Sequence, residues 1–180
     1  MKIACLGWGS LIWQPKNLLI QNKWFEDGAI LPIEFTRQSD NGRMTLIIDE
    51  KALPVRTLWA LMATDDLQIA IESLRIREDT PDLDLIHSVK VSNRPKDATR
   101  KTIVKWLKSL NLAAAIWTGL SFSGHTGNNR PRIDDVITHL NNLLGNNKDL
   151  AEEYIRKAPK QIDTEYRRRI EKEFGWTFIE

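Results

Sequence analysis

The chain begins with a short apolar run that leads into a glycine-containing loop. Residues 3–6 have the length and apolar content of a buried strand. Two glycines, Gly7 and Gly9, follow at once and allow a sharp turn or a close approach of the backbone. The amides of Gly9, Ser10 and Leu11 can then converge on one anionic group. The alternative is a tight turn that only links two core segments.

Alternating and continuous apolar segments predict most of the remaining strands in the first two thirds of the chain. The expected strands cover residues 29–36, 44–49, 55–62, 83–91 and 113–118. The polar stretch 37–43 contains Asn-Gly and predicts a hairpin connection. The segments 44–49 and 55–62 are so rich in apolar residues that we expect central strands. Residues 15–26 have no clear period and predict irregular structure.

A helical period first appears over residues 64–79, where Thr64 is the expected N-terminal cap. The apolar stripe of this helix, at spacings of four and three, consists of Leu67, Ile71 and Leu74. The next step of four is Glu78, so a carboxylate continues the stripe near the helix C-terminus. The macrodipole disfavours a negative charge there, which suits a group that takes up a proton. The alternative is a buried glutamate that only pairs with a nearby arginine.

Later segments predict helices over residues 102–110, 133–144 and 150–157, and a terminal one around Tyr166. The polar stretch 119–130 predicts a long surface link, with a mobile lid as the alternative. Strands that come mostly before helices predict an α+β fold with a mixed, curved or barrel-like sheet and flanking helices. With 180 residues, 42% of them hydrophobic, we expect one domain over residues 1–180.

The balance of charges argues against some partners. The 26 Lys and Arg against 24 Asp and Glu give a net charge of +2, too weak a field to favour nucleic acid or an anionic membrane. The basic run 167–169 stands among glutamates at helical ion-pair spacing, which indicates a solvated helix face. No apolar stretch is long enough to cross a membrane, and no leader segment is evident, so we expect a cytoplasmic protein.

Cysteine and histidine usage gives no support to a redox or metal centre. The single cysteine, Cys5, lies in the first apolar strand and cannot form an internal disulfide. The three histidines, His87, His125 and His139, have no partners at metal-ligand spacing. We therefore expect no metal and no cofactor. The sequence does not indicate an oligomeric state.

Several segments, taken in order, resemble the gamma-glutamylcyclotransferase superfamily, and the layout is closest to its glutathione-directed branch. The loop Gly7-Trp8-Gly9-Ser10-Leu11-Ile12-Trp13 is similar to that family's Gly-Tyr-Gly-Ser-Leu-Ile-Trp, and Arg77-Glu78 falls where its Arg-Glu pair holds the catalytic glutamate. Weaker similarities are Phe35-Thr36-Arg37-Gln38-Ser39, Leu58-Trp59-Ala60 and Glu153-Tyr154-Ile155. The resemblance covers the chain nearly from end to end.

The resemblance implies an enzyme that cyclises the glutamyl part of a gamma-glutamyl compound to 5-oxoproline and releases an amine or amino acid. It implies that Glu78 is the acid and base. It also implies that the loop, including Trp8, Ile12 and Trp13, and Tyr154 bind the substrate. Because the attack is intramolecular, no metal, cofactor or protein nucleophile is needed.

Two departures from the family pattern bear on the substrate. Trp8 stands where the family has tyrosine, which removes a hydroxyl and leaves one donor. Asp79-Thr80-Pro81 stands where the glutathione-directed branch tends to have glycines. The identity of the leaving group therefore stays open. The alternative function is a non-catalytic module that retains the same pocket and binds a small molecule.

Overall fold

The computed structural model describes residues 1–124 and 127–179. Contacts group the chain into two compact units. Unit 1 consists of Met1–Gly7, Gln14–Leu31 and Arg56–Gly119, and unit 2 of Trp8–Trp13, Pro32–Val55 and Leu120–Glu180. The chain passes from one unit to the other after residues 7, 13, 31, 55 and 119. The single domain expected over residues 1–180 stays a prediction.

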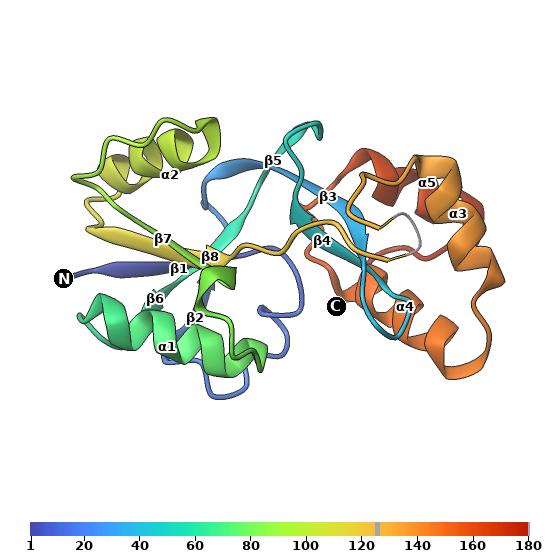
Figure 1. Ribbon diagram of the computed structural model, residues 1–180, viewed down its shortest axis with the longest axis horizontal. Helices are drawn as coiled ribbons and strands as arrows, with labels where there is room; N and C mark the ends of the chain where they lie inside the picture. Colours follow the sequence, from blue (N-terminus) through green and yellow to red (C-terminus); the bar gives the residue numbers. More distant parts are fainter. Residues whose placement is uncertain (125–126, 180) are drawn as a thin grey trace. The chain divides into compact units, whose positions relative to one another are not determined.

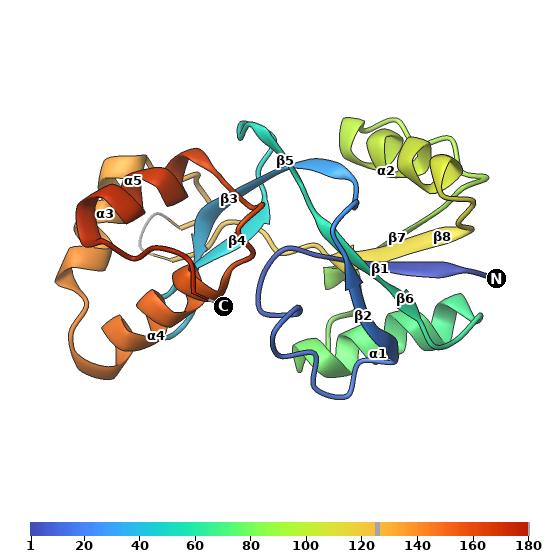
Figure 2. The same ribbon diagram turned by 180° about the vertical axis from the view of Figure 1, so that it is seen from behind.

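Unit 1 is built on a five-stranded sheet with the order β2-β6-β1-β8-β7. The central strand β1 pairs antiparallel with β6 and parallel with β8. All five residues of β1 are buried, as expected for a strand covered on both faces. Helices α1 and α2 lie on opposite faces of this sheet (Figures 1 and 2). The elements are β1 (Ile3–Gly7), β2 (Ile20–Phe25), β6 (Leu58–Met62), α1 (Leu67–Glu78), the short 3-10 helix η1 (Leu83–Leu85), β7 (Ile86–Lys90), α2 (Ala98–Ser109) and β8 (Ala114–Thr118).

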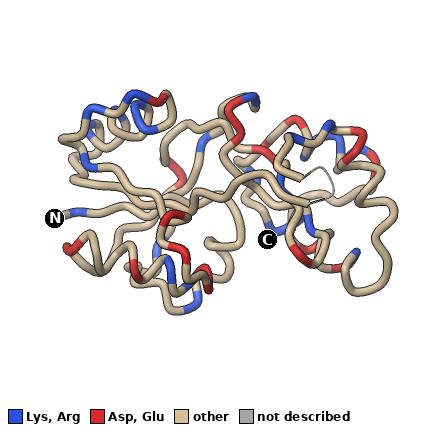
Figure 3. Tube along the Cα trace, in the orientation of Figure 1, with Lys and Arg blue, Asp and Glu red and all other residues tan. Residues whose placement is uncertain are grey.

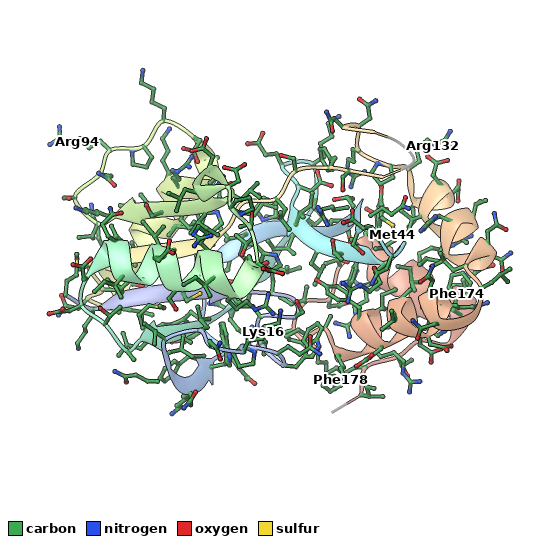
Figure 4. The ribbon with its side chains drawn as sticks, turned by 60° about the horizontal axis from the view of Figure 1, so that its bottom comes forward. Lys16, Met44, Arg94, Arg132, Phe174 and Phe178 are labelled. Carbon is green, nitrogen blue, oxygen red and sulfur yellow. The ribbon has the colours of Figure 1, made fainter. Side chains whose placement is uncertain are left out.

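The described residues of unit 2 form a three-stranded sheet, with the order β4-β3-β5, and three helices. Helix α4 contacts β4, and α3 contacts α5. Met44, at the start of β4, is 1% exposed and lies among the side chains of this unit (Figure 4). The elements are β3 (Ile30–Gln38), whose first two residues belong to unit 1, β4 (Met44–Ile48), β5 (Pro54–Arg56), whose last residue belongs to unit 1, α3 (Ile133–Asn142), α4 (Gly145–Lys157) and α5 (Glu165–Phe174).

The mixed α+β class is confirmed, but the described strands form two open sheets and no closed barrel. The expected strand 55–62 is divided at Thr57, whose hydroxyl donates to the Ala29 carbonyl at 2.8 Å. Strand β4 is an edge strand, so the expectation of a central position was wrong for it. Strand β2 lies where we expected irregular structure, because its exposed outer residues conceal a strand pattern.

Helix α1 begins later than expected and turns a different face inward. Its N-cap is Asp66, not Thr64, and the Asp66 carboxylate accepts the amides of residues 68 and 69. Asp79 ends the helix in the left-handed conformation, with φ of 54°. The buried residues are Leu67, Ala70, Ser73, Leu74 and Arg77. The buried face of α1 therefore continues to Arg77 and not to Glu78 as expected, and Glu78 lies one residue, about 100°, farther around the helix.

Charges of both signs are distributed along the helices of each unit (Figure 3). In the basic run of α5, the three arginines pair with Glu171, Asp163 and Glu173. Arg167 is 2% exposed and also donates to the carbonyls of Ala158 and Pro159, so it is not on a solvated face as expected. No helix in the described part of the chain is long and apolar enough to cross a membrane.

Candidate functional site

The loop that follows β1 folds as a turn within unit 2. The amide of Ile12 donates to the Gly9 carbonyl at 3.0 Å. No residue between Trp8 and Trp13 has a positive φ. The loop is therefore not a nest of alternating right- and left-handed residues, and amides that converge here do so as in the first turn of a helix. The cradle expected from Gly9, Ser10 and Leu11 stays a prediction.

Gly9 is required by a close approach rather than by its backbone conformation. A Cβ atom at this position would collide with the Oη atom of Tyr154, and it would lie 3.4 Å from the Cζ atom of the same ring. Tyr154 belongs to α4, far along the sequence. The structure thus brings two of the segments on which the family resemblance depends into direct contact.

Tyr154 contacts aromatic side chains and a backbone donor. Its ring meets Trp13 edge to face, with centroids 5.3 Å apart, and meets Phe35 in the same way at 6.4 Å. The amide of Leu46 in β4 donates to the Tyr154 hydroxyl at 3.4 Å. Tyr154 is 7% exposed. These contacts fix the hydroxyl against the loop.

Trp8 bonds the other backbone group of the same residue, Leu46. Its indole Nε1 donates to the Leu46 carbonyl at 3.1 Å, and the side chain is 6% exposed. Because β4 is an edge strand, the two backbone groups of Leu46 are available to these side chains. The only donor of Trp8 is thus engaged with β4, so Trp8 anchors the loop. Its expected substrate contact stays a prediction.

In unit 1, Glu78 is held by the arginine that precedes it. The Arg77 Nη1 atom donates to the Glu78 Oε1 atom at 2.7 Å. The Arg77 Nε and Nη2 atoms donate to the Gln14 carbonyl at 3.2 and 2.8 Å. The Arg77 side chain is 7% exposed and that of Glu78 is 19% exposed. Arg77 therefore has a structural role, while the Glu78 side chain stays partly exposed.

The Cys5 thiol in unit 1 is influenced by the Glu78 carboxylate. Burial raises the pKa of the Cys5 thiol far above its ordinary value, and the negative charge of Glu78 raises it further, while Arg77 opposes the shift. The charges of Glu78 and Arg77 thus act on the Cys5 thiol of β1. The thiol stays protonated and is not a nucleophile at neutral pH.

Both His87 and His139 make contacts with other residues of the protein. The His87 ring lies edge to face with Trp117 at 5.6 Å, and burial, followed by the positive charge of Arg100, lowers its pKa. His139 Nε2 is 2.6 Å from the Gly42 carbonyl, and His125 lies outside the described residues. Among residues 1–124 and 127–179, no group of three or more His, Cys, Asp or Glu could hold a metal ion.

The structure thus places the predicted site residues in two groups. Trp8, Gly9, Trp13 and Tyr154 form one cluster in unit 2, which we call the loop–Tyr154 cluster. Ser10, Leu11 and Ile12 belong to the same loop, and Leu11 is 6% exposed. Glu78 belongs to unit 1 with Arg77.

Sequence reasoning missed two charged residues of unit 2. Arg43 has its guanidinium carbon 5.6 Å from the centroid of the Tyr154 ring. Glu34 is a carboxylate with 1% exposure inside β3. The second could have been found, because a lone acid between Ile33 and Phe35 interrupts an apolar strand. Nothing in the local pattern around Arg43 indicates its partner on α4.

No protein-family model matches the sequence, and no curated protein matches it significantly. The family resemblance depends on the residues quoted above.

Proposed function

We propose that this protein is a gamma-glutamylcyclotransferase-like enzyme with the corresponding fold. It converts the glutamyl part of a gamma-glutamyl compound to 5-oxoproline and releases an amine or amino acid. The observation that supports it best is the contact between Gly9 and Tyr154. The resemblance implies that both segments bind one substrate, although they lie far apart in the sequence, at positions 9 and 154.

The proposed reaction is an internal acyl transfer. The α-ammonium group of the substrate, with a pKa of about 8, loses a proton to the Glu78 carboxylate. The free amine attacks the γ-carbonyl, a new C–N bond closes the five-membered ring, and the original γ-amide C–N bond breaks. Glu78 gives this proton to the departing nitrogen and then carries the second proton of the attacking nitrogen to it as well, so that the products are the ring amide of 5-oxoproline and a protonated amine. Atoms and charge balance without a metal, a cofactor or an enzyme nucleophile.

The proposal gives most of the predicted residues a role. The amides of Gly9, Ser10 and Leu11 hold the α-carboxylate of the substrate, so that the amine faces the γ-carbonyl. Tyr154 adds a hydroxyl beside Gly9, and Trp13 packs on its ring. Arg77 holds the Glu78 carboxylate in one orientation. The proposal requires that Glu78 and the loop act on the same substrate molecule.

Incubation of the protein with gamma-glutamyl dipeptides, gamma-glutamyl amines and glutathione tests the proposal. Mass spectrometry measures 5-oxoproline, and the best substrate identifies the leaving group. We expect 5-oxoproline from at least one compound. A folded protein that makes none from any of them would contradict the proposal. The proposal also assigns the protein to the cytoplasm, with which a single buried cysteine is compatible.

The second candidate is a binding module that retains the pocket without catalysis. The engagement of the Trp8 indole with Leu46 favours it, because the family tyrosine hydroxyl has no replacement there. If the protein is such a module, a gamma-glutamyl ligand should raise the melting temperature while no 5-oxoproline forms. Absence of any ligand-induced shift would count against it.

A further inference from the structure

The hairpin between β3 and β4 places an arginine at the loop–Tyr154 cluster. Arg43 is the residue before β4, and its guanidinium carbon lies 5.6 Å from the centroid of the Tyr154 ring. A cation at this distance interacts with the face of an aromatic ring. Tyr154 therefore contacts the substrate-binding loop through its hydroxyl and Arg43 through its ring.

Hydrogen bonds hold the tip of this hairpin in place. The Ser39 amide donates to the Arg43 carbonyl at 2.9 Å, and the Gly42 amide donates to the Ser39 carbonyl at 2.8 Å. His139 of α3 bonds the Gly42 carbonyl, with 2.6 Å between His139 Nε2 and the carbonyl oxygen. Gly42 has φ of 81°, a conformation that favours glycine. Arg43 is thus presented from a fixed turn rather than from a freely moving loop.

The charge of Arg43 is not neutralised within the described part of the chain. Its Nε atom donates to the Asn41 amide oxygen at 2.9 Å, and Asn41 is neutral. None of the ion pairs among the described residues includes Arg43. The residue is half-buried. A partly buried guanidinium that Asn41 orients, and that has no carboxylate partner, is well suited to bind an anionic group.

We propose that Arg43 binds a carboxylate on the leaving group, so that the preferred substrates are gamma-glutamyl amino acids or peptides rather than gamma-glutamyl amines. This inference rests on the proposed function, in which the loop amides bind the other carboxylate of the substrate. A gamma-glutamyl amino acid carries a second carboxylate, and a gamma-glutamyl amine does not. Arg43 and the loop contact the same tyrosine, which places the two anion-binding groups on one cluster of unit 2.

The test compares gamma-glutamylalanine with gamma-glutamylethylamine, which lacks only the second carboxylate. Arg43→Met keeps most of the side-chain volume and removes the charge. We expect kcat/KM for gamma-glutamylalanine to fall roughly 10- to 100-fold, as for loss of a charge-assisted hydrogen bond, with kcat/KM for gamma-glutamylethylamine little changed. Arg43→Lys keeps the charge but loses the planar fork, so it should restore part of the preference.

The matched control is Arg169→Met, which removes an exposed arginine that pairs with Glu173 on α5. It should leave the preference between the two compounds unchanged. Melting temperatures of all variants identify any loss of folding. An equal fall for both compounds in Arg43→Met, or no fall for either, would overturn the proposal.

Calorimetric binding separates failure of this inference from failure of the proposed function. In Glu78→Gln, which should bind without turnover, gamma-glutamylalanine should bind more tightly than gamma-glutamylethylamine. The added change Arg43→Met should remove that difference. If the wild-type protein makes no 5-oxoproline, the proposed function fails, while this binding difference still decides the role of Arg43. Equal affinities, or no binding of either compound, would overturn the role of Arg43.

Discussion

Each unit contains one conspicuous glutamate, and the two differ in how their oxygens are used. Glu34 in unit 2 has 1% exposure. Its Oε1 atom accepts bonds from the Phe35 amide and the Thr164 hydroxyl, and its Oε2 atom accepts the Tyr166 amide at 3.2 Å. Glu78 in unit 1 has one ion pair, to Arg77, and its side chain is 19% exposed.

The comparison shows that depth of burial alone does not identify a catalytic carboxylate. Glu34 connects β3 to the N-terminus of α5, and both of its oxygens are occupied by the protein. It is therefore a structural group. Glu78 has a counter-ion and remains partly accessible, which is what a group that exchanges protons with a substrate needs. Substitution of Glu78 should therefore lower activity, and substitution of Glu34 should lower stability.

The largest expected effect is on turnover in Glu78→Gln. Loss of an acid and base should lower kcat roughly 100- to 10,000-fold, and the melting temperature should change little because the amide can still accept from Arg77. The measurement is the rate of 5-oxoproline formation.

Glu72→Gln on the same helix provides the matched control. Glu72 pairs with Arg75, and neither residue belongs to the proposed site. Its turnover should equal that of the wild-type protein. Equal rates for Glu78→Gln and Glu72→Gln would remove Glu78 from the mechanism.

The next effect concerns the contact between the loop and Tyr154. In Gly9→Ala the added methyl group collides with the tyrosine hydroxyl, and overpacking of this kind costs about 1–3 kcal/mol. We expect a higher KM and a lower melting temperature. The double variant Gly9→Ala/Tyr154→Phe lacks the hydroxyl and should recover part of the lost stability. If the stability effects of Gly9→Ala and Tyr154→Phe simply add in the double variant, the contact between Gly9 and Tyr154 does not contribute to stability in solution.

A smaller effect should come from Glu34→Gln, and it should appear in stability. The amide retains one acceptor oxygen but faces at least one backbone donor with its NH₂ group, so the free energy of unfolding should fall by about 1–2 kcal/mol. Turnover per folded molecule should stay near the wild-type value. Denaturant unfolding measures the free energy of unfolding. A large loss of turnover in the folded variant would contradict the structural role of Glu34.

The smallest effect is the pH dependence that Glu34 gives to stability. Burial raises the pKa of Glu34 above its ordinary value of 4.5, despite the bonds from Thr164, Phe35 and Tyr166 and the nearby Arg130. The folded state therefore binds this proton more tightly than the unfolded state. The resulting stabilisation is fully present below pH 4.5 and is lost as pH rises through the folded-state pKa.

Relative to Glu34→Gln, the wild-type protein should thus lose stability as pH rises from 4.5. Unfolding curves of both proteins at pH values above 4.5 test the direction of this change in stability. A wild-type protein that gains stability relative to the variant over the same range would contradict it.

The parts of the fold that follow a local pattern could be predicted from the sequence. Strand β1, the hairpin from β3 to β4, and α5 each carry a clear period or turn signal. The face of α1 could not be read correctly, because the partly exposed Ile71 resembles a core residue and Arg77 is buried despite its charge. The Gln14 carbonyl and the Glu78 carboxylate accept hydrogen bonds from this buried arginine.

Prediction of the candidate site from the sequence has the same limit. The loop and Tyr154 could be named from the family resemblance, but the collision that makes Gly9 necessary depends on contact between segments distant in the sequence. Leu46 contributes its backbone N–H and C=O to these contacts, which any residue except proline could supply, so no sequence pattern marks it. Arg43 likewise depends on a tertiary contact.

The most direct test of the central claim follows the fate of the glutamyl carbon atoms. A gamma-glutamyl substrate carrying ¹³C in the glutamyl part is incubated with the wild-type protein, and products are measured by mass spectrometry. The proposed mechanism predicts labelled 5-oxoproline and free leaving group in equal amounts, with no labelled glutamate. Labelled glutamate as the product would show hydrolysis by water, and recovery of unchanged substrate would show binding without chemistry. Either result would contradict internal cyclisation.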